Sequence, residues 1–71
     1  MEVIIYTKRK CPNCTAAKQL LRAKNINYVE MDIEARPEVL DDLPEGVRQM
    51  PQIFINGKRV NGLAGLQEAL K

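Results

Sequence analysis

Two cysteines, Cys11 and Cys14, are the residues of this 71-residue chain best suited to chemistry. They enclose Pro12 and Asn13 and directly follow a basic loop at residues 8–10. A thiolate at the start of a helix is stabilised by unpaired N–H groups and by the positive end of the helix dipole. We therefore expect a lowered pKa for Cys11. Cys14 should lie one turn further along, less exposed and close enough to Cys11 to form a disulfide.

This cysteine pair predicts thiol–disulfide exchange. The Cys11 thiolate would attack a target disulfide, and Cys14 would then displace the reduced target from the mixed disulfide. The chain has no histidine, which excludes a Ser-His or Cys-His catalytic pair. Exchange needs neither a general base nor a metal. The alternative is that both cysteines are buried small residues or form a passive bridge.

The N-terminal half predicts a βαβ unit with a right-handed crossover. Residues 3–7 are apolar or β-branched, as in a strand that is buried on both faces. Pro12 suits the first turn of a helix that we expect over residues 12–24. Residues 28–33 alternate apolar and acidic side chains, which indicates a second strand with one polar face.

The C-terminal half predicts a short helix, a hairpin and a final helix. Pro37 and Pro44 bracket the short helix at residues 38–43. Strands at 52–55 and 58–60 flank Asn56-Gly57, the strongest signal for a type I′ turn. From Gly62 onward, leucines at 63, 66 and 70 form one apolar helix face. We expect a single α/β domain over residues 1–71, with the order βαβ, α, ββα.

Pro51 directly precedes the third predicted strand, where a missing N–H does least harm to the sheet. Its peptide bond is either cis or trans on the residues alone. If the turn faces Cys11, the backbone of Met50 would pair with an extended substrate chain, as a sheet edge does. The three aromatic residues lie on predicted strands and favour core packing over nucleic-acid binding.

Charge is segregated along the chain although the net charge is only +2. Residues 1–25 hold six basic side chains and one acidic one, whereas residues 26–45 hold seven acidic side chains and one basic one. Such segregation either steers an anionic partner or forms a solvated face of the first helix. No apolar run approaches the length of a membrane span, and the N-terminus does not resemble a secretory signal. We expect a cytoplasmic protein without membrane or nucleic-acid partners.

Taken together, four segments resemble a glutaredoxin of the thioredoxin fold: Tyr6-Thr7-Lys8, Cys11-Pro12-Asn13-Cys14, Met50 to Gly57, and Val60-Asn61-Gly62. The resemblance covers essentially the whole chain and implies a four-stranded mixed sheet flanked by three helices. It implies that Cys11 is the nucleophile, that Cys14 is the resolving cysteine and that Pro51 is a cis-proline. It also implies that Lys8 contacts a glutathione carboxylate. The expected substrate-binding residues are Lys8, Pro12, Asn13, Met50, Pro51 and Gly62.

The resemblance leaves two reductants open, and no bound cofactor is expected. The family commonly has an aspartate, which holds the glutathione amino group, near the position of Ala64. The stretches Arg36 to Glu38 and Arg48 to Pro51 are similar to redoxins that serve ribonucleotide reductase and are reduced by thioredoxin reductase with NADPH. The implied partners are therefore disulfide-containing proteins, among them ribonucleotide reductase, with glutathione or thioredoxin reductase as reductant. We expect a monomer.

Two further classes use the same cysteines differently. Paired thiolates suit soft metals, so the chain is alternatively a copper-binding module, or an iron–sulfur module built from two chains and glutathione. The third class is a binding domain that kept the fold without redox activity, and a normal Cys11 pKa would favour it.

Overall fold

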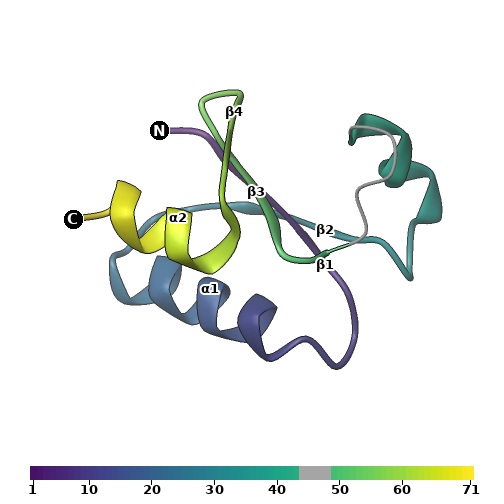
Figure 1. The fold of residues 1–71 in the computed structure, drawn as a ribbon, viewed down its shortest axis with the longest axis horizontal. Coiled ribbons are helices and arrows are strands. Elements are labelled where there is room, and N and C mark those ends of the chain that lie inside the picture. The colour runs from purple at the N-terminus through teal and green to yellow at the C-terminus, as the bar shows by residue number, and fades with distance from the viewer. Residues whose placement is uncertain (44–48) are drawn as a thin grey trace.

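The computed structural model describes residues 1–43 and 49–71, and within them one four-stranded sheet forms the centre of the molecule (Figure 1). The strands are β1 (Val3–Thr7), β2 (Val29–Asp32), β3 (Gln52–Ile55) and β4 (Lys58–Val60). Their order is β2-β1-β3-β4. β1 pairs in parallel with β2 and antiparallel with β3, and β3 pairs antiparallel with β4. The predicted mixed sheet is confirmed.

Helix α1 (Pro12–Ala23) begins at the residue that the sequence predicts and ends one residue earlier. Pro12 occupies the first turn, where its missing N–H removes no helical hydrogen bond. At the other end Asn25 adopts a φ of 59°. The N–H of Asn25 donates a hydrogen bond to the carbonyl of Arg22, and the N–H of Ile26 donates one to the carbonyl of Leu21. This left-handed cap stops the helix and turns the chain back toward β2.

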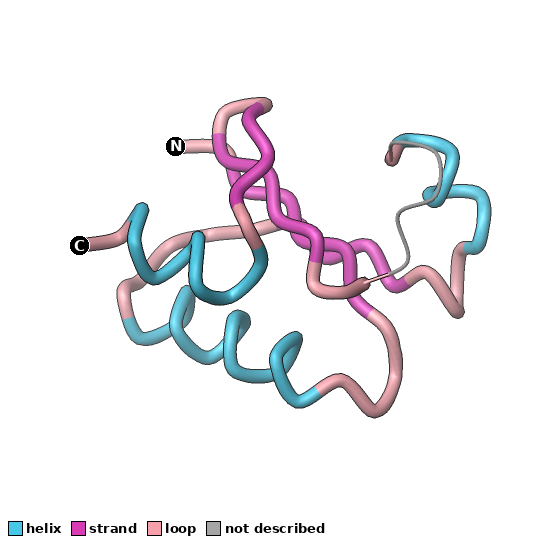
Figure 2. The backbone as a smooth tube through the Cα atoms, in the orientation of Figure 1, coloured by secondary structure: helices cyan, strands magenta, loops and turns pink. Residues whose placement is uncertain are grey.

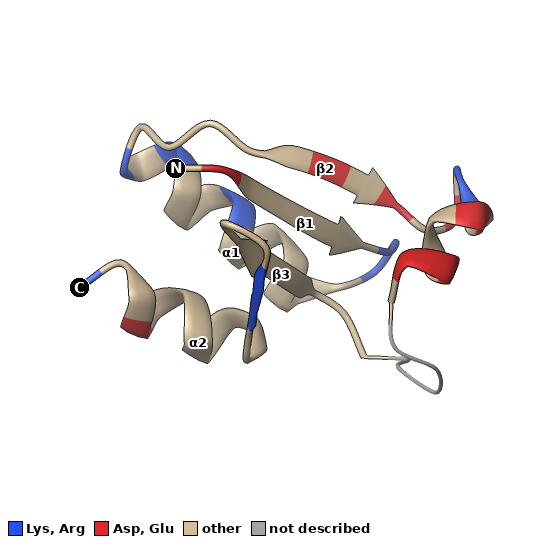
Figure 3. Ribbon diagram, turned by 90° about the horizontal axis from the view of Figure 1, so that it is seen from above, with Lys and Arg blue, Asp and Glu red and all other residues tan. Residues whose placement is uncertain are grey.

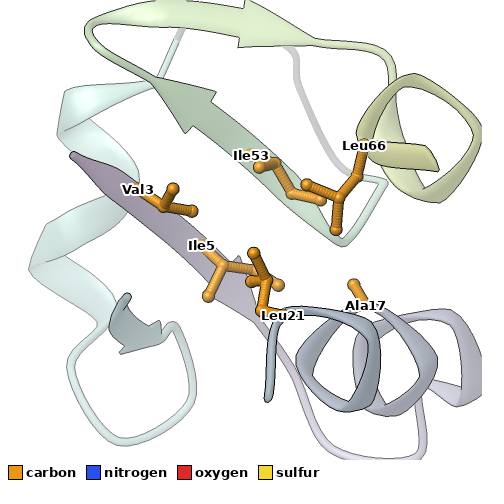
Figure 4. Close-up of a cluster of buried hydrophobic side chains, with 6 residues drawn as sticks. All are labelled: Val3, Ile5, Ala17, Leu21, Ile53 and Leu66. Atoms are coloured by element: carbon orange, nitrogen blue, oxygen red, sulfur yellow. The ribbon is translucent and has the colours of Figure 1, made fainter. Parts of the chain in front are cut away.

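Helices α1 and α2 (Gly62–Ala69) lie side by side on the same face of the sheet (Figures 1 and 2). The apolar side chains between the helices and the sheet form the main core, which Figure 4 shows in close-up. Ile5, Leu21, Ile53 and Leu66 have no exposed surface there. This core fixes α1, and therefore the cysteines at its start, against the end of β1.

On the other face the short helix is a 3₁₀ helix, η1 (Pro37–Asp42), which begins and ends one residue before the predicted span of 38–43. Its N–H groups bond three residues back, as from Val39 to Arg36 and from Leu43 to Leu40. Six residues are too few to nucleate a stable α-helix, so the tighter turn is favoured. Pro44, which we predicted to follow the helix, lies outside the described residues.

β2 is shorter than predicted, because Tyr28 and Ile33 lie outside the paired region. Its apolar face is only partly covered. Met31 and Ile33 pack against a second core, a cluster of Tyr6, Cys11, Cys14, Val39, Leu43 and Met50, whereas Val29 is 51% exposed. Its polar face turns toward α1, where Glu30 meets Lys18. The prediction of one polar face is correct, but that face contacts a helix because β2 is an edge strand beside α1.

The hairpin of β3 and β4 forms as predicted. Asn56 and Gly57 have φ values of 52° and 84°. Positive φ at both positions is the requirement of a type I′ turn, which suits Asn and Gly. In the described part of the chain, no helix has both the length and the apolar character needed to cross a membrane.

Candidate active site

Cys11 and Cys14 form a disulfide at the start of α1, with their Cα atoms 5.2 Å apart. Cys11 is the N-cap residue, and the N–H of Cys14 donates a hydrogen bond to Cys11 Sγ at 3.1 Å. Cys11 is 9% exposed and Cys14 only 2% exposed. The predicted pairing is therefore present, and Cys11 is the more exposed of the two cysteines. The hydrogen bond from the N–H of Cys14, together with the positive end of the helix dipole, favours the thiolate of Cys11.

One side of the disulfide faces the turn before β3. Cys11 Sγ lies 3.6 Å from the carbonyl oxygen of Met50, and the Met50-Pro51 peptide bond is cis. Met50 and Pro51 are both buried. Gly62, at the start of α2, has a φ of 59°, and a Cβ atom built on it would come within 4.0 Å of the Pro51 carbonyl. Of the predicted substrate-binding residues, Met50 thus lies against Cys11, Pro51 follows it, and Gly62 lies behind Pro51.

On the β2 side of the disulfide there is an open depression of about 570 Å³. Lys8 and Pro12 line it together with both cysteines, so these predicted site residues share one surface. Asn13 is exposed on the first turn of α1 and does not line the depression. The full lining is Thr7, Lys8, Arg9, Lys10, Cys11, Pro12, Cys14, Thr15, Lys18, Glu30 and Asp32.

A polar network inside this depression has no counterpart among the predicted site residues. Lys18 Nζ donates to Glu30 Oε2 at 2.9 Å, and the hydroxyl of Thr7 donates to the same oxygen at 2.8 Å. The hydrogen bond from Lys18 is the main cause that holds the pKa of Glu30 below its ordinary value. The Thr7 bond adds to it, and burial acts in the opposite direction. The helical spacing of Cys14 and Lys18 was the only sequence signal for this network.

The cysteines also belong to the second core, on the face opposite α2. Cys11, Cys14 and Met50 pack there with Tyr6, Val39 and Leu43. Tyr6 and Phe54 meet edge to face, with ring centroids 5.8 Å apart. Burial, helped by the nearby Asp42 carboxylate, raises the pKa of Tyr6. Tyr6 and Phe54 therefore pack in the core from strands, as predicted, whereas Tyr28 precedes β2 and packs against the main core.

Opposite charges meet near the disulfide. Figure 3, which colours the ribbon by residue type, shows basic residues on the loop after β1 and acidic residues along β2 and the segment after it. Arg9 joins the two regions through an exposed ion pair with Glu34 at 3.2 Å.

Within residues 1–43 and 49–71, no three His, Cys, Asp or Glu side chains gather as metal ligands.

Known proteins resemble this chain in sequence and in architecture. The profile of the glutaredoxin family matches residues 3–60. A glutaredoxin from Neisseria meningitidis serogroup A is 39% identical over 90% of this chain and 79% of its own length. The solution structure of glutaredoxin from Brucella melitensis is also 39% identical, with a TM-score of 0.77 over 99% of this chain and 78% of that one. The glutaredoxin-like NrdH-redoxin from Escherichia coli is 25% identical, with a TM-score of 0.77 over 89% of this chain and 84% of that one.

These matches extend over most of the chain, and the region they share contains both cysteines and Pro51. The mixed sheet with its flanking helices is the thioredoxin-like fold of those structures. The chain therefore belongs to the glutaredoxin family, and it is a glutaredoxin-like thiol–disulfide oxidoreductase.

Proposed function

We propose that this protein works in the cytoplasm, where it reduces disulfides of proteins and mixed disulfides between proteins and glutathione. We also propose that glutathione restores its dithiol. Cys11 is the nucleophile and Cys14 the resolving cysteine. The observation that carries the assignment of roles is the position of Cys11, which is the more exposed cysteine and caps α1. We further propose that it acts as a monomer and holds no resident metal.

The reaction has two exchange steps. The Cys11 thiolate attacks one sulfur of the target disulfide, so that a bond forms to Cys11 Sγ and the second target sulfur leaves as a thiolate, which takes up a proton. Cys14 then loses its proton and attacks Cys11 Sγ, which releases the first target sulfur. Two electrons pass from the dithiol to the target. Two glutathione molecules return them and become glutathione disulfide.

The turn before β3 supports a role in holding the substrate. The Met50 carbonyl and the cis bond to Pro51 lie beside Cys11, just before the start of β3. Main-chain groups placed this way can pair with an extended backbone on either side of a substrate cysteine. Lys8 lines the adjoining depression and supplies a cation for a glutathione carboxylate.

A second candidate is supported by the start of α2. Its first turn carries no acidic residue, and Ala64 is exposed there. An uncharged turn offers no carboxylate to an ammonium group of glutathione. Together with the likeness to NrdH-redoxin, this favours a redoxin that thioredoxin reductase reduces and that donates electrons to ribonucleotide reductase.

The deciding experiment is NADPH oxidation with a model disulfide, comparing glutathione plus glutathione reductase with thioredoxin reductase. We expect turnover with glutathione, and a loss of at least about 100-fold in Cys11→Ser because the nucleophile is gone. Cys14→Ser should accumulate a mixed disulfide with a protein substrate, visible by mass spectrometry. Turnover only with thioredoxin reductase would favour the second candidate, and a fully active Cys11→Ser would refute both.

Ala64→Asp separates the two candidates further. The new carboxylate should lower the KM for glutathione several-fold if glutathione binds along the first turn of α2, because it would pair with the ammonium group. Ala69→Asp places the same charge at the exposed far end of the helix and serves as the control.

A further inference from the structure

Lys18 and Glu30 form the least exposed ion pair among the described residues. Their side chains are 24% and 35% exposed, whereas those of the other pairs are 42% to 79% exposed. Thr7, only 3% exposed, donates to the same Glu30 oxygen. The carboxylate is thus held from two sides, by β1 and by α1, and its position is fixed.

This pair lines the same depression as Cys14. Lys18 is one helical turn after Cys14 on α1, and residues at that spacing are neighbours on a helix surface. Glu30 reaches the same depression from β2, and all three residues line it. Cys14 itself is almost completely buried, so nearby charges act on its sulfur with little screening by water.

The two cysteines need different protonation states in the reduced protein. Cys11 has to be a thiolate to attack, whereas Cys14 has to remain a thiol until the mixed disulfide has formed. The surroundings do not favour different protonation states, because most charges around the depression are positive and would stabilise the thiolate of either cysteine. The titratable groups that face the cysteines are Lys8, Arg9 and Lys10 of the loop, Lys18 of α1, Glu30 and Asp32 of β2, and Tyr6 of β1 with Asp42 of η1 behind it.

We propose that Glu30 is a positioning residue that cancels the charge of Lys18 at Cys14, so that Cys14 stays protonated while Cys11 ionises. The ion pair thereby distinguishes the resolving cysteine from the nucleophile. The proposal rests on the dithiol reaction described above and is independent of which reductant serves it.

The test is a thiolate titration by absorbance near 240 nm in a Cys11→Ser background, where Cys14 is the only thiol. Glu30→Gln leaves the Lys18 charge uncompensated and should lower the Cys14 pKa by about 0.5 unit. Lys18→Gln leaves the carboxylate alone and should raise it by about the same amount. The double variant should return to within ~0.2 unit of the parent, since the pair then contributes no charge. Glu68→Gln, which breaks the exposed pair with Lys71, is the matched control.

The opposite signs separate an electrostatic role from a structural one, because a loosened fold would shift both single variants in the same direction. Shifts of the same sign, or shifts no larger than that of Glu68→Gln, would overturn the proposal. If Glu30→Gln does not fold, the sign in Lys18→Gln decides alone. The titration needs no disulfide substrate, so it is informative even if the proposed reductant is wrong.

Discussion

Cys11 and Cys14 illustrate how much surroundings matter at the scale of a residue. Both are cysteines on the first turn of one helix, yet Cys11 caps the helix and lies against the Met50 carbonyl. Cys14 is more deeply buried and shares its depression with the ion pair of Lys18 and Glu30. Neighbours from other elements and from the next turn of α1 therefore give two identical side chains different surroundings.

Glu30 also makes the stability of the fold depend on pH. Its pKa is below the ordinary value of 4.5, chiefly because Lys18 donates a hydrogen bond to it. A carboxyl whose folded pKa is lowered stabilises the fold above its unfolded pKa and loses that contribution as the pH falls through the folded value. Glu30→Gln should therefore cost about 0.5–1 kcal/mol of unfolding free energy near neutral pH, as partly exposed ion pairs do.

Urea denaturation well above and well below the ordinary value of 4.5 measures this effect. The difference between wild type and Glu30→Gln should shrink toward zero in acid. Glu68→Gln should show a smaller difference under both conditions, because its pair with Lys71 is exposed at the chain end. A Glu30→Gln cost that is equally large in acid would contradict the assignment.

At the scale of elements, the crossover of β1, α1 and β2 sets where the cysteines lie, and α2 locks that crossover in place. Leu66 is the residue of α2 that is completely buried against the sheet and α1 (Figure 4). The start of the same helix also brings Gly62 against Pro51. The packing of α2 therefore supports both the core and the turn beside the active site.

Leu66→Ala should destabilise the fold by about 3 kcal/mol, because the cavity adds to the lost transfer free energy. That is a large part of the stability of so small a domain. Leu40→Ala makes the same chemical change on η1, where the side chain is 38% exposed, and should cost only about 0.5 kcal/mol. Thermal unfolding followed by circular dichroism compares the two, and equal losses would contradict the assigned core.

At the scale of the whole molecule, basic residues gather on the loop beside the disulfide, and acidic residues gather on β2 and η1 (Figure 3). Lys8, Arg9 and Lys10 are exposed and line the depression beside the disulfide. Positive charge on this loop raises the local concentration of anionic partners and increases their rate of association, and salt weakens this effect.

We expect a peptide disulfide flanked by aspartates to be reduced with a kcat/KM about 3–10 times that of one flanked by lysines at low ionic strength. The ratio should approach one at about 0.5 M salt, where the screening length is a few ångströms. Replacing Arg9 and Lys10 by Gln should abolish the preference. The same replacement of Lys58 and Arg59 on the distant hairpin should preserve it, and a preference lost equally in both variants would argue against local steering.

Much of the fold could be predicted because local rules governed it. The apolar run at residues 3–7 became β1, Pro12 began α1, Asn25 ended it, and Asn56-Gly57 formed the turn. The short helix was less predictable: its six residues, of which Pro37 is the first, are too few for a stable α-helix and form a 3₁₀ helix, and its Val39 packs into the second core. Likewise, the exposure of Val29 depends on what covers the edge of the sheet.

The chemistry could be predicted from the chain alone, because it rests on two cysteines at the start of a helix, after a basic loop, in a βαβ unit. These features depend on residues close together in the chain, whose spacing and propensities act before the fold is complete. In contrast, the contacts of Met50 with Cys11, of Gly62 with Pro51, and of Glu30 with Thr7 and Lys18 could not be read from the chain. Those contacts depend on strand order, register and helix packing, which the free energy of the whole core selects.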